Sequence, residues 1–371
     1  MPKIATFDDW VDLFRQWHED IGIERSVIGD YHFEAKFGVL ASDEIEFGAF
    51  AGERKWETVL QIPDQRIRDT LLNYLIVQGD TEFASVEQQR HLIATAPNNY
   101  DRRALVRIMT EEMRHGWQMS YLLVSYFGGS GRVEAEKLLQ RRAFKRNRLL
   151  GAFNEEVRDW LDFLVYTEFQ DRDGKYQLTM FRHSAFAPLA RSMPPMLREE
   201  AFHLGTGHNG LKRVVKAGKI PSRLMQKYVY KWLPACYDLF GTDGSSSAHW
   251  AYTWGLKGRY DEGTTPKPAD LDHLNEVARS LYVRELEALV GDLNRSIPAD
   301  QPTLRLPDLK FRAASGIMQA NPTPSMAPCS RRRPMHDTSR TCYPRPTTSN
   351  SSMHSSRSRT GSNRDPSNRE G

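Results

Sequence analysis

This sequence has few cysteines, no long apolar run and no apolar leader, and each shortage excludes a class of protein. Its 371 residues include three cysteines, Cys236, Cys329 and Cys342, with no close-spaced pair, so neither a disulfide framework nor a thiolate zinc site is supported. No stretch approaches 18 consecutive apolar residues, so we expect no membrane-spanning helix. The first ten residues, MPKIATFDDW, contain no signal core, which argues against secretion. We therefore expect a cytoplasmic protein in a reducing environment.

The net charge is small, +4, and all of the excess lies at the carboxyl end. Residues 321–371 contain nine arginines, no lysine and three acidic residues, whereas residues 1–320 contain 42 basic and 44 acidic residues. The body is nearly neutral, so nucleic-acid binding is not expected. The tail is dominated by Ser, Arg and Pro and cannot bury a core. It is either a disordered basic arm that binds an anionic partner or an out-of-frame translation, and we favour the second.

Apolar residues recur at helical spacing through the middle of the chain and predict four long helices. The first lies within residues 67–96, and the second follows the turn at 96–101 and ends at the glycine-rich stretch 128–131. The third begins after Asn154. The fourth starts near Pro194 and Pro195, which a first helical turn tolerates. Short strands are possible at 32–40 and 44–50, and residues 221–295 are mostly helical in pattern.

Acidic residues and histidines interrupt these apolar stripes in a repeated arrangement. The Glu-x-x-His step occurs as Glu112/His115 and as Glu200/His203. A lone carboxylate precedes each step, because Glu82 lies 30 residues before Glu112 and Asp171 lies 29 before Glu200. Two antiparallel helical hairpins with this spacing would bring four carboxylates and two imidazoles to one point, the arrangement of a di-iron or di-manganese bundle site. The alternative is a core network of salt bridges, and we favour the metal site.

Glycines after the second step also fit a nucleotide-binding pattern, since residues 205–210 read Gly-x-Gly-x-x-Gly. A dinucleotide fingerprint needs a strand before it and a helix after it, whereas these glycines follow a helix that already carries Glu200 and His203. We therefore predict that the stretch binds metal and that its glycines loosen or end the helix. Because no other nucleotide-binding motif is present, reducing equivalents must come from a second protein.

Three further polar residues lie near the predicted ligands in the sequence, and none of them is predicted to be a ligand. Gln78 lies one turn before Glu82, where it either orients substrate or oxygen or is an ordinary core amide. Glu168 shares the stripe of Asp171, but the 29-residue offset favours Asp171 as the ligand. His208 lies off the face of His203, and we predict that it is not a ligand.

Whole blocks of this sequence resemble a known family. They include QGDTEFASVEQQRHL (78–92), EEMRHGWQMSYLL (111–123), DRDGKYQL (171–178), PLARSMPPMLREEAFHL (188–204) and DLFGTDGSSSAHWAYTWGLKGRYDEG (238–263). Over about residues 60–312 the chain is similar to the oxygenase components of benzoyl-CoA 2,3-epoxidases, which belong with the phenylacetyl-CoA epoxidase catalytic subunits. The resemblance implies a ferritin-like di-iron site formed by Glu82, Glu112, His115, Asp171, Glu200 and His203.

The same resemblance implies an activity and a partner. The expected reaction is epoxidation of an aromatic ring held as a CoA thioester, with O₂ and with electrons from a separate NADPH-dependent reductase that carries FAD and iron–sulfur clusters. The first 60 residues match the family poorly, which leaves the acyl-CoA open. After about Phe311 the expected folded chain gives way to the Ser/Arg/Pro tail, which is why we favour the out-of-frame interpretation.

These observations predict a mainly α-helical, ferritin-like four-helix bundle with added helices and a small mixed N-terminal region. The expected parts are an N-terminal extension (1–65), the di-iron bundle (66–220), a helical C-terminal part of the same domain (221–312) and the tail (313–371). Basic clusters at 137–148 and 211–219 are candidates for binding the CoA phosphates. The alternative functions are a related protein for another acyl-CoA, or a non-enzymatic metal-binding or scaffold component. No nucleic-acid or membrane partner is expected.

Overall fold

A computed structural model describes residues 4–29, 31–264, 266, 271–309, 311–312 and 319–320. The predicted mainly helical fold is confirmed. The α-helices are α1 (Phe7–Asp20), α2 (Arg25–Ile28), α3 (Gln65–Gln89), α4 (Asn99–Tyr126), α5 (Gly128–Gln140), α6 (Trp160–Phe181), α7 (Ala187–Ala217), α8 (Ser222–Leu239), α9 (Ser246–Thr253) and α10 (Leu274–Asn294). Short 3₁₀ turns lie at Val59–Gln61, Arg90–Thr95, Ala143–Lys145 and Gly151–Asn154, and two-residue strands β1 (Phe311–Arg312) and β2 (Gln319–Ala320) pair antiparallel.

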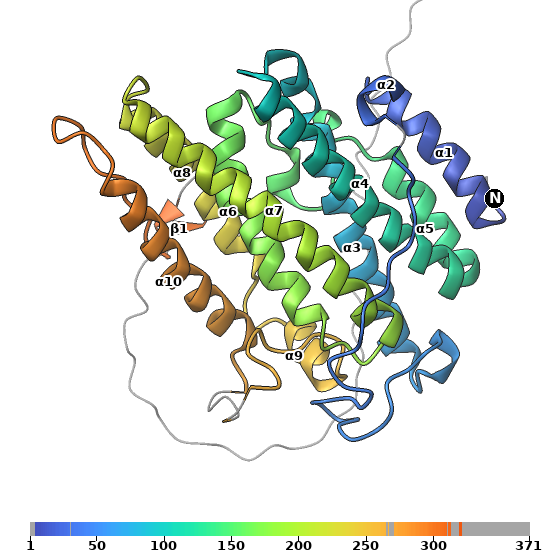
Figure 1. Ribbon diagram of the computed structural model, residues 1–371. Helices are drawn as coiled ribbons and strands as arrows, with labels where there is room; N and C mark the ends of the chain where they lie inside the picture. The colour runs from blue at the N-terminus through green and yellow to red at the C-terminus, as the bar shows by residue number, and fades with distance from the viewer. Residues whose placement is uncertain are drawn as a thin grey trace, which may run out of the picture. The chain divides into compact units, whose positions relative to one another are not determined.

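The four longest helices form the bundle, as two hairpins packed together. Helix α3 packs on α4, and α6 packs on α7, while α4 and α7 join the two pairs. Figure 1 shows α1 and α5 on one side of this bundle and α8 and α10 on the other. The predicted hairpin organisation of the two Glu-x-x-His steps is therefore present.

Capping residues set the starts of three bundle helices. The side chains of Asp64, Asn98 and Asp159 accept hydrogen bonds from backbone N–H groups in the first turns of α3, α4 and α6, which satisfies donors that a helix start leaves free. Helix α6 therefore begins at Trp160, later than the predicted start directly after Asn154. The glycine-rich stretch 128–131 does follow the end of α4, but it forms the first turn of α5.

The predicted start of the fourth helix is wrong. Helix α7 begins at Ala187, so Pro194 and Pro195 lie inside it. Pro195 has no N–H for the carbonyl oxygen of Arg191, one turn earlier. The backbone N–H of Gly38 donates to that oxygen instead, at 2.7 Å. An extended segment from elsewhere in the chain thus replaces a missing helical hydrogen bond, and the helix continues.

The glycines at 205–210 do not end α7, contrary to prediction. The helix runs to Ala217 and ends at Gly218, whose φ of 63° is left-handed. A Cβ at Gly207 would lie 2.7 Å from the backbone nitrogen of Glu168, and one at Gly210 would lie 2.3 Å from Leu164. These two glycines therefore let α6 and α7 approach closely, so their role is in helix packing.

The possible strands at 32–40 and 44–50 are also not formed. The backbone N–H of Lys36 donates to Gln118 Oε1 on α4 at 2.7 Å, as that of Gly38 does to Arg191 on α7. Because helices take up these donors, the segment needs no partner strand. Only isolated bridges occur nearby in the described chain, Glu44 with Arg54 and Trp56 with Phe186.

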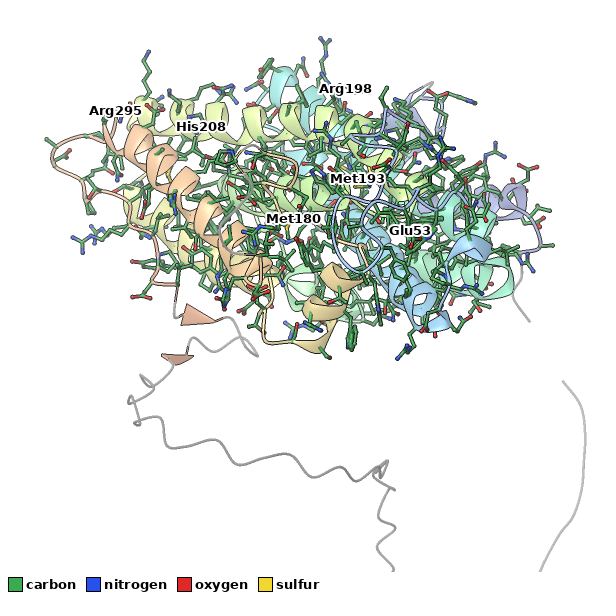
Figure 2. The ribbon with its side chains drawn as sticks, turned by 90° about the horizontal axis from the view of Figure 1, so that it is seen from below. Glu53, Met180, Met193, Arg198, His208 and Arg295 are labelled. Atoms are coloured by element: carbon green, nitrogen blue, oxygen red, sulfur yellow. The ribbon has the colours of Figure 1, made fainter. Side chains whose placement is uncertain are left out.

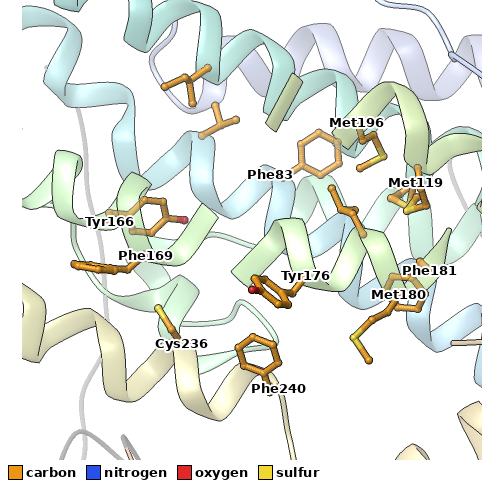
Figure 3. Packing of buried hydrophobic residues seen from close by; sticks show 14 of the residues in the cluster. Phe83, Met119, Tyr166, Phe169, Tyr176, Met180, Phe181, Met196, Cys236 and Phe240 are labelled. Atoms are coloured by element: carbon orange, nitrogen blue, oxygen red, sulfur yellow. The ribbon is translucent and has the colours of Figure 1, made fainter. Parts of the chain in front are cut away.

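Aromatic and sulfur-containing side chains fill the space between the bundle and α8 and α10. Figure 3 shows Tyr176 beside Phe240, and their ring centroids are 6.0 Å apart. Cys236 is also buried in this layer.

None of the described helices is long and apolar enough to cross a membrane. Residues Met1–Pro322 form one compact unit; the predicted tail lies outside the described residues apart from β2.

Candidate metal centre

All six predicted ligands are buried side chains of the four bundle helices. Helix α3 carries Glu82, α4 carries Glu112 and His115, α6 carries Asp171, and α7 carries Glu200 and His203. Five of the six make two groups whose ligand atoms lie within 4.8 Å of one another, Glu82–Glu112–His115 and Glu112–Glu200–His203. Glu112 belongs to both groups, which is the position of a bridging carboxylate. Asp171 belongs to neither group.

The two imidazoles, which come from opposite hairpins, share the carboxylate of Glu200 as a close neighbour. His115 Nδ1 lies 3.5 Å from Glu82 and 3.6 Å from Glu200. His203 Nδ1 lies 3.3 Å from Glu112 and 3.4 Å from Glu200. The repeat read from the sequence therefore corresponds to an arrangement in space in which each Glu-x-x-His step directs its donors to a common centre.

Several inward-facing atoms of this cluster lack a hydrogen-bond partner among the described residues. They are Nδ1 of His115, Nδ1 of His203, Oε2 of Glu200 and Oδ2 of Asp171. A buried polar atom without a partner is costly, and these four are lone-pair donors. Such a set fits cations bound between them, and oxygen with imidazole nitrogen suits iron, manganese or zinc. Asp171 has a free oxygen of this kind, although it lies outside the two tight groups.

Without a bound cation, the buried carboxylates repel one another, and this repulsion affects their pKa values. Burial, and then the charge of Glu82, raise the pKa of Glu112 well above its usual value. Burial, and then the charge of Glu200, do the same to the pKa of Asp171. Burial alone would lower the pKa of His203, but the charge of Glu200 and hydrogen bonds to carboxylates outweigh it and raise that pKa well above normal. Bound cations would relieve this repulsion.

Two further glutamates, which the sequence reasoning missed, hold the outer edges of the imidazoles. His115 Nε2 lies 2.9 Å from Glu199 Oε2, and His203 Nε2 lies 3.0 Å from Glu111 Oε2. Each histidine is thus held by the residue that precedes the metal-facing glutamate of the other hairpin. A signal was present, because both steps read Glu-Glu-x-x-His. A carboxylate on one imidazole nitrogen fixes the tautomer that presents the other to a metal.

Arginines neutralise both outer glutamates. Arg114 makes a bidentate ion pair with Glu199, and Arg107 Nε donates to Glu111 at 2.9 Å. Burial raises the pKa of Glu199, but hydrogen bonds from His115 and Arg114 outweigh it and lower the pKa to about 2. Burial likewise raises the pKa of Glu111, and the hydrogen bond from His203 together with Arg107 lowers it overall. Both outer carboxylates are therefore anionic at neutral pH.

Of the three other polar residues considered in the sequence, Gln78 contacts the cluster, whereas Glu168 and His208 pair with each other. Gln78 Nε2 donates to Glu82 Oε1 at 2.5 Å, so this amide touches a candidate ligand. Glu168 pairs with His208 at 3.1 Å and with Arg172 at 3.3 Å. Figure 2 shows His208 on α7 near α10, where its other nitrogen lies 3.3 Å from Asp292. Glu168 and His208 thus pair with each other on the side of the bundle that faces α10.

A cavity of about 1250 Å³ leads to the cluster between α3, α6 and α8. Glu82, Glu112, Asp171 and Glu200 all line it. Its walls also include Gln78, apolar side chains of α6, and Arg146 from the basic cluster 137–148. The carboxylate–histidine cluster is therefore reachable by a ligand of considerable size.

Comparison with known proteins identifies the family of this chain. The family model described as phenylacetic acid catabolic protein matches residues 57–276. Benzoyl-CoA oxygenase component B of Aromatoleum evansii is 39% identical over 336 residues, which cover 79% of this chain and 69% of that protein. A 1,2-phenylacetyl-CoA epoxidase subunit of Escherichia coli (strain K12) is 22% identical over 252 residues, 67% of this chain and 73% of that protein. The predicted resemblance is confirmed.

Proposed function

This chain belongs to the phenylacetic acid catabolic protein family, and we propose that it is the oxygenase component of an aryl-CoA epoxidase. The proposed substrate is benzoyl-CoA, and the reaction consumes O₂, NADPH and a proton and yields the ring epoxide, water and NADP⁺. The observation that carries the proposal is the buried carboxylate–histidine cluster, whose four carboxylates line a large cavity. The names of the two relatives, a benzoyl-CoA oxygenase component and a phenylacetyl-CoA epoxidase subunit, support the choice of substrate.

The proposed cofactor is a pair of iron ions held by Glu82, Glu112, His115, Asp171, Glu200 and His203. Such a pair supplies the reduction of O₂ and the delivery of one oxygen atom to the substrate. Glu112 would be the favoured residue to contact both ions, because its carboxylate belongs to both close groups of donors. Glu200 is the second candidate bridge, since its two oxygens lie 3.6 Å and 3.4 Å from the two histidines.

The chain's own residues prepare the site in three ways. Gln78 holds Glu82 in place through its amide N–H, and it lines the cavity, where it can also orient a ligand. The outer glutamates hold the imidazoles with Nδ1 turned inward. The buried side chains Leu178 and Phe181 make one stretch of the cavity wall apolar, which excludes water and favours an aromatic ring.

The CoA phosphates require cations at the cavity mouth. Of the two basic clusters predicted for this role, only 137–148 contributes a cavity-lining residue, the exposed Arg146. Other arginines of that cluster have internal partners, since Arg148 pairs with Asp80 and Glu87. No residue of 211–219 lines the cavity. Lys231 on α8 also lines it, so Arg146 and Lys231 are the proposed phosphate contacts.

The electron donor in this proposal is a separate NADPH-dependent reductase with FAD and iron–sulfur clusters. It is required because the one nucleotide-binding pattern in the sequence, at 205–210, lies inside a helix without the strand that such a motif needs before it. A cytoplasmic location follows from the same proposal, since its substrate and reductant are cytoplasmic metabolites. This location and the identity of the reductase stay predictions.

The proposal is tested by turnover of the iron-loaded protein with a compatible reductase and NADPH. Benzoyl-CoA should be converted to an epoxide with one O₂ consumed per product, and free benzoate should not react. Turnover of benzoate as fast as of its thioester would refute the CoA assignment. An iron-loaded protein that oxidises no aryl-CoA under conditions where its relative is active would favour the scaffold alternative.

A further inference from the structure

Gly174 occupies a helical position for which the protein's packing gives no reason. A glycine inside a helix is destabilising by about 1 kcal/mol relative to alanine. Gly174 is partly buried, whereas fully buried glycines of the bundle have a packing reason: a Cβ at Gly116 would lie 2.6 Å from the ring of Phe83, and one at Gly79 would lie 2.8 Å from Leu138. A Cβ at Gly174 would meet nothing within 4 Å, and its φ is not left-handed. Helix α6 nonetheless runs through it unbroken.

The open space beside Gly174 is the cavity that leads to the metal centre. Gly174 itself lines that cavity, and it is the middle of the helical stripe that does so. The other members, at three, four and seven residues from it, are Gln170, Asp171, Gln177, Leu178 and Phe181. Residues at these spacings share one helix face. A side chain at position 174 would therefore project from the centre of this wall into the cavity.

The position also lies close along the helix to one of the candidate ligands. Asp171 lies one turn before Gly174, a rise of about 4.5 Å along the axis. Leu178 and Phe181 continue the wall on the other side of Gly174 and are buried. A flat ring resting against the bare backbone at Gly174 would thus have the Asp171 carboxylate toward one edge and the side chains of Leu178 and Phe181 toward the other. Across the cavity, α3 contributes Gln78 and Glu82.

We propose that Gly174 is a specificity-determining residue, whose missing side chain makes room for the aromatic ring of the acyl group beside the metal centre. This inference rests on the proposed function, because it takes the cavity's ligand to be an aryl-CoA. It predicts that the size of residue 174 limits the size of the acyl group, while the CoA part binds elsewhere along the cavity.

The experiment compares Gly174→Ala and Gly174→Leu with wild type in the full chain. Binding of benzoyl-CoA, 2-naphthoyl-CoA and acetyl-CoA is measured by calorimetry, and turnover is measured with the reductase. Gly174→Leu should weaken benzoyl-CoA binding by about tenfold or more, whereas acetyl-CoA binding should be unchanged. Gly174→Ala should weaken binding less than Gly174→Leu does. Among the three thioesters, 2-naphthoyl-CoA should lose the most affinity. Neither variant should lower Tm, because the added atoms enter open space.

Gly291 on α10 provides the matched control. It is also a helical glycine with nothing within 4 Å of an added Cβ, and it does not line the cavity. Gly291→Ala and Gly291→Leu should leave the binding of all three thioesters unchanged. Equal benzoyl-CoA binding by wild type and Gly174→Leu would overturn the inference, as would equal losses for acetyl-CoA and benzoyl-CoA. If benzoyl-CoA binding depends on the size of residue 174 as predicted but the wild-type protein does not oxidise benzoyl-CoA, the proposed reaction fails and the acyl subsite stands.

Discussion

Glu111 and Glu199 decide which nitrogen of each histidine is free for a metal. Each accepts a hydrogen bond from the Nε2–H of the histidine on the opposite hairpin, at 3.0 Å and 2.9 Å, so the lone pair of Nδ1 points inward. The two contacts cross between α4 and α7 and therefore also join the hairpins. Arg114, fully buried, completes the arrangement around Glu199.

Replacing Glu199 with Gln should weaken metal binding more than it weakens the fold. The neutral amide no longer increases the basicity of His115, and changes to such outer partners typically cost about 10- to 100-fold in metal affinity. We expect a loss of this size for Glu199→Gln and for Glu111→Gln in a Co²⁺ titration followed by visible absorption. Helical circular dichroism should be retained.

A second carboxylate–histidine pair provides the control for this prediction. Glu46 lies 3.0 Å from His183 Nδ1 and also pairs with Lys55, and none of the three belongs to the metal-binding groups. Glu46→Gln should lower thermal stability without changing the Co²⁺ affinity. If all three variants lose affinity equally, Glu111 and Glu199 act only through the general stability of the protein.

At the scale of helices, hydrophobic periodicity located the four bundle helices but not their ends. The start of α7 was misplaced because Pro194 and Pro195 indicate a first turn. The carbonyl that Pro195 leaves free is satisfied by Gly38, about 150 residues earlier in the sequence, and no local pattern reveals such a partner. The same long-range contact explains why residues 32–40, with a strand-like pattern, lie extended against α4 and α7.

The glycines at 205–210 of α7 differ from the sequence prediction for a related reason. A local pattern cannot distinguish a glycine that ends a helix from one that admits a neighbouring helix. Gly205 and Gly207 differ in this respect, since an added Cβ meets nothing within 4 Å at Gly205 but lies 2.7 Å from α6 backbone at Gly207. Backbone cannot yield as a flexible side chain can.

Alanine at these two positions should therefore have opposite effects on stability. Gly207→Ala forces α6 and α7 apart and should destabilise the protein by about 1–3 kcal/mol. Gly205→Ala should be neutral or stabilising by up to about 1 kcal/mol, because it removes only the entropic disadvantage of glycine. Urea denaturation of the metal-free proteins measures both. Equal effects would mean that the spacing of α6 and α7 is not set at Gly207.

For the whole molecule, the two hairpins are approximate repeats of one unit, and this is why the sequence predicted so much of the site. The 30- and 29-residue offsets match α3 with α4 and α6 with α7, and they place Glu82 and Asp171 at equivalent positions. The offsets give the level of each residue along the bundle. They do not give contacts between hairpins. The repeated Glu-Glu-x-x-His pattern marks Glu111 and Glu199 in the sequence, but their crossed contacts with the histidines and the cavity beside α8 are seen only in the structure.

The buried charge of the centre leads to a prediction about metal content. Glu82, Glu112, Asp171 and Glu200 are buried side chains that supply up to four negative charges, and two divalent ions would balance them. We expect two irons per chain after anaerobic reconstitution, measured by elemental analysis. Metal binding to the native state alone should also raise Tm, since a ligand at about 100 times its Kd adds about 2.7 kcal/mol. Chelation should reverse the increase.

Asp171 and Glu168 provide a matched pair for this prediction, because both are buried carboxylates of α6. Asp171 has a buried oxygen without a hydrogen-bond partner, whereas Glu168 is occupied by His208 and Arg172. Asp171→Ala should bind fewer than two irons and lose most of the metal-dependent rise in Tm. Glu168→Ala should have a lower Tm without metal, because His208 and Arg172 lose their partner, but it should still bind two irons. The reverse result would make Glu168 the ligand, and a folded wild-type protein with one iron or none would exclude the di-iron centre altogether.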